Sequence, residues 1–93
     1  MSEKRFSSVW QAIEETPAAA ENMKMRSALM MALNEFIAVE GLSQAKAAEL
    51  LGVTQPRISD LVRGRINLFS LDTLVNMVAD AGLKVEMKVG RAA

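Results

Sequence analysis

The sequence predicts an all-α domain of five helices that is followed by one C-terminal β-strand. Three observations support this fold class. Glycines divide the chain into segments of helical length, apolar residues within these segments recur every three or four positions, and the period changes to two only after the last of these glycines. The 93 residues are enough for one domain with one small core. The dividing glycines are Gly41, Gly52, Gly64 and Gly82.

The first two expected helices lie before Gly41. A short amphipathic helix is expected over Ser8–Glu15. Thr16 then caps a long helix, because Pro17 suits the first helical position and an alanine-rich run follows it. The apolar residues at helical spacing in this long helix are Met25, Leu29, Leu33, Phe36 and Ile37.

Three shorter helices follow, each with a hydroxyl residue at its expected N-cap and a glycine after its last turn. The middle one has a proline in its first turn. Pro56 is sterically acceptable there, but it removes an amide and disfavours helical geometry at Gln55, so this helix starts at either Thr54 or Gln55. The expected N-caps are Ser43, Thr54 and Ser70, and the expected ends are Gly52, Gly64 and Gly82.

The segment after Gly82 alternates apolar and charged residues, which is typical of a half-buried strand. An unpaired strand exposes a row of backbone donors and acceptors, and the chain has no second alternating run to pair with it. We therefore expect pairing with the same strand of a second copy, antiparallel about a two-fold axis. The alternative is a frayed tail or a segment packed on its own helices. The expected dimerisation residues are Leu83, Val85, Met87 and Val89.

The composition excludes several classes of function. The chain has no cysteine and no histidine, which removes disulfides, thiolate nucleophiles, imidazole bases and nearly every zinc, haem or iron–sulfur ligand set. We therefore expect no enzyme activity, no cofactor and no metal site. Uncharged stretches reach only eight residues, far short of the roughly 20 that span a bilayer, so we expect no membrane segment. The absence of a signal-peptide pattern favours a cytoplasmic location.

Charge is unevenly distributed, although the net charge is zero. Residues 1–40 carry four bases against six acids, whereas residues 41–93 carry seven bases against five acids. Arg57, Arg63 and Arg65 form the densest basic cluster, and a local cluster sets the surface potential within a Debye length of about 10 Å. A neutral chain of this kind can still present a basic surface to nucleic acid.

Residues 43–64 have the spacing of a helix-turn-helix, in which each of six positions has a mechanical reason. Ala48 is small where two helices cross closely, and Gly52 takes a turn conformation that larger residues disfavour. Such a motif holds its second helix out as a rigid rod that lies in the DNA major groove. The six positions are Gln44, Ala48, Gly52, Val53, Ile58 and Leu61.

Residues 41–87 resemble the helix-turn-helix of the phage-repressor and Cro-like (XRE) regulators; they read GLSQAKAAELLGVTQPRISDLVRGRINLFSLDTLVNMVADAGLKVEM. The upstream segment, with NMKMRS at residues 22–27, is similar to a narrower group of that superfamily, the small HigA-type antitoxins and antitoxin-like regulators. This resemblance implies a five-helix lambda-repressor-like core, DNA binding as a homodimer and repression of the protein's own operon, often beside a toxin gene.

The resemblance also implies which residues read bases. They are the polar positions left on the second motif helix once Ile58, Leu61 and Val62 are assigned inward. Arg57 is the foremost candidate, because its fork matches guanine O6 and N7. Gln55 reads adenine or orients Arg57. The predicted base-reading set is Gln55, Arg57, Ser59 and Asp60.

A second set of residues is expected at phosphates, where contacts add affinity without sequence choice. Gln44, the first residue after the cap of the first motif helix, would bond a phosphate together with nearby backbone amides. Asp60 has two interpretations, because a carboxylate repels phosphate unless it accepts from a cytosine amine or pairs with Arg57 or Arg63. The predicted phosphate set is Gln44, Lys46, Thr54, Arg63, Arg65 and Asn67.

The sequence therefore predicts a homodimeric transcriptional repressor that binds a palindromic operator in double-stranded DNA, with a toxin protein as a further partner. The expected organisation is an N-terminal segment with a short helix over residues 1–16, a helix-turn-helix domain over residues 17–82, and a dimerisation strand and tail over residues 83–93. The alternative is a protein-interaction module that neutralises a toxin without reading DNA.

Overall fold

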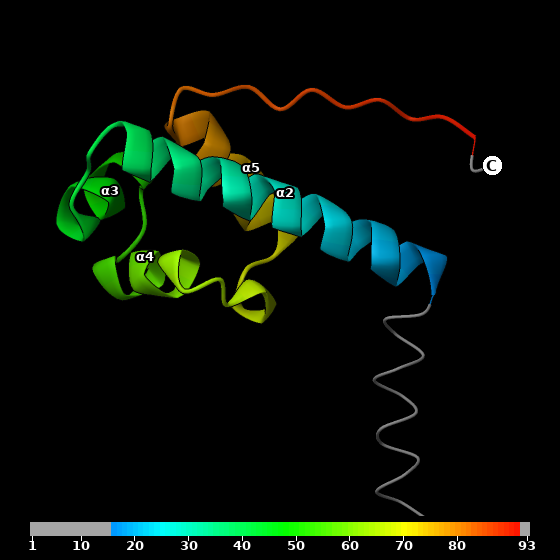
Figure 1. Cartoon of the computed structure of the whole chain (residues 1–93), viewed down its shortest axis with the longest axis horizontal. Helices are drawn as coiled ribbons and strands as arrows, with labels where there is room; N and C mark the ends of the chain where they lie inside the picture. The colour runs from blue at the N-terminus through cyan, green and yellow to red at the C-terminus, as the bar shows by residue number, and fades with distance from the viewer. Residues whose placement is uncertain (1–15, 92–93) are drawn as a thin grey trace, which may run out of the picture.

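The computed structural model describes residues 16–91, and within this range the regular structure is entirely helical (Figure 1). The all-α class is confirmed, and four of the five expected helices are present. The first expected helix, Ser8–Glu15, lies outside the described residues. No helix in the described range is both long and apolar enough to cross a membrane. The elements are α2 (Pro17–Val39), α3 (Gln44–Leu51), α4 (Gln55–Val62), the 3-10 turn η1 (Ile66–Leu68) and α5 (Leu71–Asp80).

Every described helix begins at its expected N-cap. Thr16, Ser43, Thr54 and Ser70 each accept a hydrogen bond from the amide three residues later, which satisfies one of the donors that a helix start leaves free. Thr54 lies outside α4 in an extended conformation, so this helix starts at Gln55. The proline in its first turn is therefore accommodated without loss of the cap.

One apolar core lies between α2 and the elements that follow it. Helix α2 packs on α5, α4 and η1, while α3 packs on α4 and α5. Phe69, which lies between η1 and α5, is only 1% exposed and joins this core. The core residues are Met30, Leu33, Ile37, Ala47, Ala48, Leu51, Ile58, Leu61, Phe69, Leu74, Met77 and Val78.

The inward assignment of Val62 is wrong, because its side chain is 49% exposed. Ile58 and Leu61, three residues apart, already supply the buried stripe of α4. Val62 lies a further 100° around the helix from Leu61 and therefore faces solvent. The solvent-facing side of α4 consequently carries one apolar side chain, Val62, among polar ones.

The segment after α5 forms no strand in the described part of the chain. It leaves the helix with the Leu83 amide bonded to the Val78 carbonyl at 3.1 Å, and then runs towards the N-terminal end of α2 (Figure 1). A strand exists only where a neighbour accepts and donates its backbone hydrogen bonds, and residues 16–91 contain no second extended segment to do so. Val85 packs against the core of its own chain, as the alternative interpretation of this segment expects.

Candidate nucleic-acid interface

The unit formed by α3, its turn and α4 has the packing that its spacing predicts. Ala48 is 8% exposed on α3, and Ile58 and Leu61 are fully buried beneath α4. Gly52 ends α3 with φ 67° and ψ 32°, a left-handed conformation that costs glycine little. The Val53 amide then donates to the Ala48 carbonyl at 3.1 Å. These contacts fix the orientation of α4 relative to α3.

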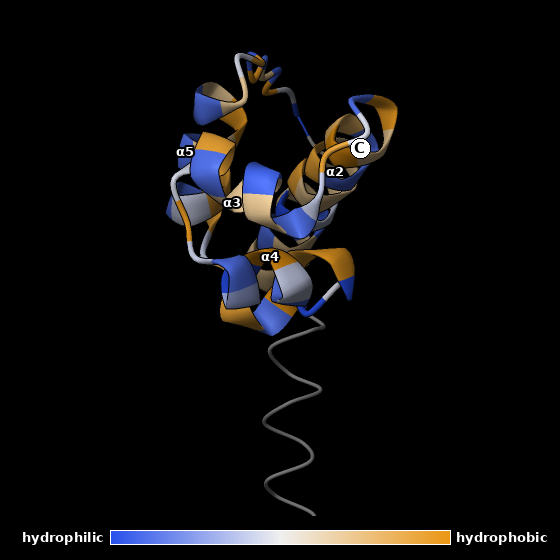
Figure 2. Cartoon of the chain, turned by 90° about the vertical axis from the view of Figure 1, so that its left-hand side faces the viewer, coloured by the Kyte–Doolittle hydropathy of each residue, from blue (hydrophilic) through white to orange (hydrophobic). Residues whose placement is uncertain are grey.

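Helix α4 has one buried side and one accessible side. It lies at the edge of the folded part in two perpendicular views, and no other described element covers its outer surface (Figures 1 and 2). Gln55 at its start and Arg63 just after its end are exposed, and Ser59 between them is partly exposed. Because these three residues are spaced four apart, they lie along one side of the helix. The outer side of α4 can therefore approach a partner along its whole length.

The predicted base-reading residues Gln55 and Ser59 lie on this outer side, but Asp60 is already engaged. Its carboxylate Oδ1 lies 3.7 Å from Nη1 of Arg65, and the two side chains are 25% and 53% exposed. The partners expected from the sequence were Arg57 and Arg63, whereas the structure pairs Asp60 with Arg65, the residue after Gly64. No group of acidic side chains within residues 16–91 is arranged to hold a metal ion.

The fourth base-reading candidate, Arg57, is held against η1. Its Nη1 donates to the Leu68 carbonyl at 2.9 Å, and its Cζ lies 5.3 Å from the centroid of the Phe69 ring. A guanidinium has five N–H donors, so this bond leaves four of them for other partners. A cation above an aromatic ring adds about 0.5 to 1 kcal/mol at a partly exposed site. The Arg57 guanidinium is therefore positioned before any ligand binds.

The predicted phosphate-contacting residues are all exposed and lie on both sides of the reading helix in the sequence. Lys46 pairs with Glu49 at 3.9 Å, but both side chains are more than two-thirds exposed, and such pairs contribute little. The Lys46 ammonium is therefore free to exchange this partner for a phosphate. Exposed residues before the reading helix are Gln44, Lys46 and Thr54, and those after it are Arg63, Arg65 and Asn67.

Two residues of α2 outside the predicted site donate hydrogen bonds to backbone carbonyls of η1 and α4. Arg26 Nη1 donates to the Ile66 carbonyl at 3.2 Å, and its Nε donates to Asn22 Oδ1 at 2.7 Å. Asn34 Nδ2 donates to the Leu61 carbonyl at 3.1 Å. The Arg26 bond attaches η1 to the long helix, and the Asn34 bond attaches the last turn of α4 to it.

A signal for Arg26 is present in the sequence. Arg26 stands four residues before Met30, and the core residues Leu33 and Ile37 continue the same stripe of α2. A charged residue in line with an apolar stripe needs a partner where it meets the core. The partner is a backbone carbonyl 40 residues away, and no pattern in the sequence identifies it.

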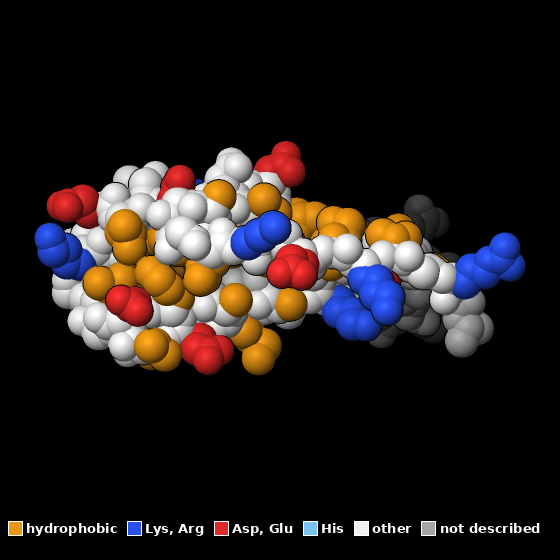
Figure 3. Space-filling view, turned by 90° about the horizontal axis from the view of Figure 1, so that it is seen from above, with side chains coloured by type: hydrophobic (Ala, Val, Ile, Leu, Met, Phe, Trp, Pro, Cys, Tyr) orange, Lys and Arg blue, Asp and Glu red, His pale blue; other side chains and the backbone are white. Residues whose placement is uncertain are grey.

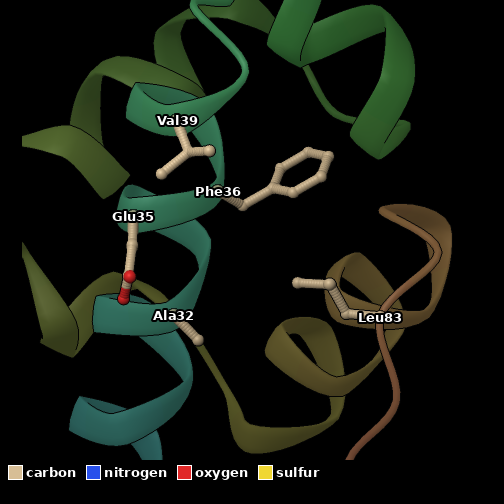
Figure 4. A pocket seen from close by; sticks show the side chains of 5 residues that line it. All are labelled: Ala32, Glu35, Phe36, Val39 and Leu83. Carbon is tan, nitrogen blue, oxygen red and sulfur yellow. The ribbon is translucent and has the colours of Figure 1, made fainter.

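An apolar groove lies on a different side of the molecule, between α2 and the chain that follows α5. Its volume is about 300 Å³, and its lining residues are Ala32, Glu35, Phe36, Val39 and Leu83. The side chains of Phe36 and Leu83 point into the same space from the two segments (Figure 4). Apolar side chains also gather on the face that carries the C-terminal segment (Figure 3). This groove is a candidate surface for contact with another protein.

The remaining predicted dimerisation residues are exposed. Leu83 is 39% exposed, Met87 66% and Val89 85%, so only Val85 of the four packs substantially on its own chain. Apolar side chains this accessible bury further surface when a partner covers them.

Comparisons with known proteins agree with this geometry. Residues 12–90 match the model of a family described as a helix-turn-helix domain. A solved structure that carries the name XRE-family transcriptional regulator is similar, with 33% sequence identity, a TM-score of 0.72, and coverage of 78% of this chain and 82% of that chain. No curated protein matches the chain. The chain belongs to the helix-turn-helix domain family, and its motif is of the XRE type.

Proposed function

We propose that this chain is a sequence-specific DNA-binding transcriptional repressor. The observation that carries the proposal is the outer side of α4, a polar surface on a helix that Ala48, Ile58 and Leu61 hold in a fixed orientation. In helix-turn-helix proteins the second helix enters the major groove, and its N-terminal residues contact base edges. The name of the similar solved structure, a transcriptional regulator, supports the same class of function.

Base reading is assigned to Gln55, Arg57, Ser59 and Asp60. The Gln55 amide, exposed in the first turn, matches adenine N6 and N7. Arg57 keeps its bond to the Leu68 carbonyl and offers its remaining donors to guanine O6 and N7. Ser59 lies one helical turn after Gln55, on the same side of α4. Asp60 can accept from a cytosine amine through its second carboxylate oxygen, since its contact with Arg65 involves Oδ1 alone.

Phosphate binding provides the affinity in this proposal. Each subunit offers three exposed basic side chains to phosphates, those of Lys46, Arg63 and Arg65, and neutralised phosphates release counterions in proportion to their number. Roughly six to ten phosphate contacts per dimer would lower the affinity about 10³- to 10⁵-fold between 50 and 200 mM salt. The assigned residues are Gln44, Lys46, Thr54, Arg63, Arg65 and Asn67.

The proposed binding unit is a homodimer on a palindromic operator, with the two reading helices in successive major grooves about 34 Å apart. Support comes from the C-terminal segment, in which three of the four alternating apolar residues, Leu83, Met87 and Val89, are exposed. Pairing residues 83–89 with the same segment of a second copy would satisfy their backbone groups and cover these side chains.

The operator is proposed to lie upstream of the protein's own gene, as in antitoxin-like regulators. The support for this narrower assignment is the sequence likeness at residues 22–27. A toxin gene directly beside this one would favour an antitoxin role, and a solitary gene would favour a plain regulator.

Fluorescence anisotropy of the full chain on a labelled duplex from upstream of its gene tests the proposal. We expect a preference of about 10³-fold over a scrambled duplex, and Arg57→Ala to lose mainly that preference. Arg63→Ala should weaken binding to both duplexes alike and reduce the salt slope by about one. Arg91→Ala, with the same loss of charge away from the motif, is the matched control. A flat salt response with equal affinity for both duplexes would contradict the proposal.

A second candidate function is supported by the groove that Phe36, Val39 and Leu83 line. In this version the chain neutralises a toxin by contact at the groove and does not read DNA. The product of the neighbouring gene should then bind the chain, and Val39→Asp should weaken that complex, because Val39 is 74% exposed and its loss leaves the core intact. Preserved binding by Val39→Asp would contradict contact at this groove.

A further inference from the structure

The chain between α4 and α5 is held by side chains from two other helices. Arg26 on α2 donates to the Ile66 carbonyl at 3.2 Å, and Arg57 on α4 donates to the Leu68 carbonyl at 2.9 Å. These two carbonyls belong to the first and last residues of η1. The 3-10 turn is therefore hydrogen-bonded at both ends by guanidinium groups. We name this pair, Arg26 and Arg57, the two-arginine clamp.

The clamp restrains a turn with few bonds of its own. The Leu68 amide donates to the Arg65 carbonyl at 3.0 Å, and the Phe69 amide donates to the Ile66 carbonyl at 3.1 Å. The Ile66 carbonyl thus accepts from both an amide and Arg26, which uses both of its lone pairs. Three residues of 3-10 helix are too short to be stable alone. The shape of this turn therefore depends on side chains outside it.

Arg26 is itself held in a fixed orientation. Its Nε donates to Asn22 Oδ1 at 2.7 Å, within one turn of α2, and this bond directs the guanidinium towards η1. Bonds from a charged donor are shorter and stronger than neutral ones. Asn22 and Arg26 both belong to NMKMRS, the segment whose role the helix-turn-helix alone does not explain.

We propose that Arg26 is a positioning residue for DNA binding. Through η1 it sets the carbonyl that holds the Arg57 guanidinium, and it sets the backbone that carries Arg65 and Asn67. Arg26 lies on α2, outside the reading helix, and acts on DNA only by way of this turn. The inference rests on the proposed repressor function, and it adds a residue on which operator affinity depends.

A double-mutant cycle in the full-length protein tests the inference. At a temperature where all variants are folded, Arg26→Ala should weaken operator binding about tenfold. In an Arg57→Ala background the same change should cost less than about threefold, because the path through the Leu68 carbonyl to Arg57 is already broken and only the path through Arg65 and Asn67 remains. Lys24→Ala removes the same charge from an exposed site on α2 and should leave binding unchanged. Equal losses in both backgrounds would overturn the inference.

Two further variants separate positioning from charge and from stability. Arg26→Lys keeps the charge but lacks the planar fork that serves two acceptors, so it should restore only part of the affinity. Asn22→Ala, at an exposed site, keeps the Arg26 guanidinium but removes the hydrogen bond that orients it. This change should weaken operator binding about threefold. Full rescue by lysine, or wild-type affinity in Asn22→Ala, would overturn the positioning role. The second variant also provides a test if Arg26→Ala does not fold.

Amide hydrogen exchange tests the clamp without DNA. Arg26→Ala should speed exchange at the Leu68 and Phe69 amides while the amides of α5 keep their protection. Unchanged exchange at both amides would overturn the inference even if the wild type binds its operator. Conversely, a wild-type protein that binds operator and scrambled duplexes equally would contradict the proposed function. The hydrogen-exchange result would then still test whether Arg26 holds η1. The two failures are therefore distinguishable.

Discussion

At the scale of single residues, the turn between α3 and α4 depends on Gly52. Its φ of 67° lies in the left-handed region, and a Cβ built there would lie 3.3 Å from Asp80 Oδ2. The backbone conformation therefore favours glycine, and the Asp80 side chain, which is exposed, adds a close contact that a Cβ would have to displace. The sequence predicted the first reason from the motif spacing. The second depends on a residue 28 positions away, which no local pattern reveals.

Gly52→Ala should lower the free energy of unfolding by about 1 to 2 kcal/mol, because a Cβ disfavours left-handed geometry. Urea denaturation followed by circular dichroism measures the change. Gly64→Ala, at φ 73° with nothing within 4 Å, isolates the cost of the backbone conformation from that of the contact. Gly90→Ala, with neither feature, is the neutral control. Equal stability of Gly52→Ala and Gly90→Ala would contradict this account of the turn.

At the scale of elements, the helices were the most predictable part of the fold. Thr16, Ser43, Thr54 and Ser70 each cap the helix that the sequence assigned to them, because a cap bonds an amide only three residues away. Exposure was less predictable. Val62 was assigned inward by its apolar character, but which side of α4 is buried depends on where α2 and α3 pack.

Helix α4 should accordingly tolerate changes on one side only. Ile58→Ala should lower the free energy of unfolding by about 2 to 5 kcal/mol, since Ile58 is fully buried and its loss leaves a cavity. Val62→Ala should change it by less than about 0.5 kcal/mol. Urea denaturation of both variants measures these effects. A large loss from Val62→Ala would show that this side chain is covered in solution.

At the scale of the whole molecule, long-range contacts escaped prediction. The bond from Arg26 to Ile66 spans 40 residues, and Phe69, which lies between η1 and α5 outside any helical pattern, is buried in the core. Such contacts are set by how elements meet, whereas propensity and periodicity describe each element alone. The candidate interface was predictable to the extent that it lies on the motif, which is local in sequence. The partners of its supporting residues on α2 were not, because they lie far away in the sequence.

The assembly of two copies remains a prediction at this scale. Met87→Asp should convert the dimer to a monomer in sedimentation equilibrium at a fixed protein concentration, because a buried unpaired carboxylate opposes pairing. Met87 is 66% exposed in the single chain, whereas Val85 packs on its own core, so the former change leaves the fold intact. Lys88→Asp introduces an acid on the other side of the segment and serves as control. An unchanged dimer in Met87→Asp would place the interface elsewhere.

The central claim is that a dimer of this chain reads DNA sequence through α4. The most direct test is selection of bound duplexes from a random-sequence pool by the purified protein, which assumes nothing about the position of the operator. The account predicts enrichment of an inverted repeat with half-site centres about 10 base pairs apart, or a multiple of that spacing. A pool that gains no common sequence after repeated selection would contradict the claim.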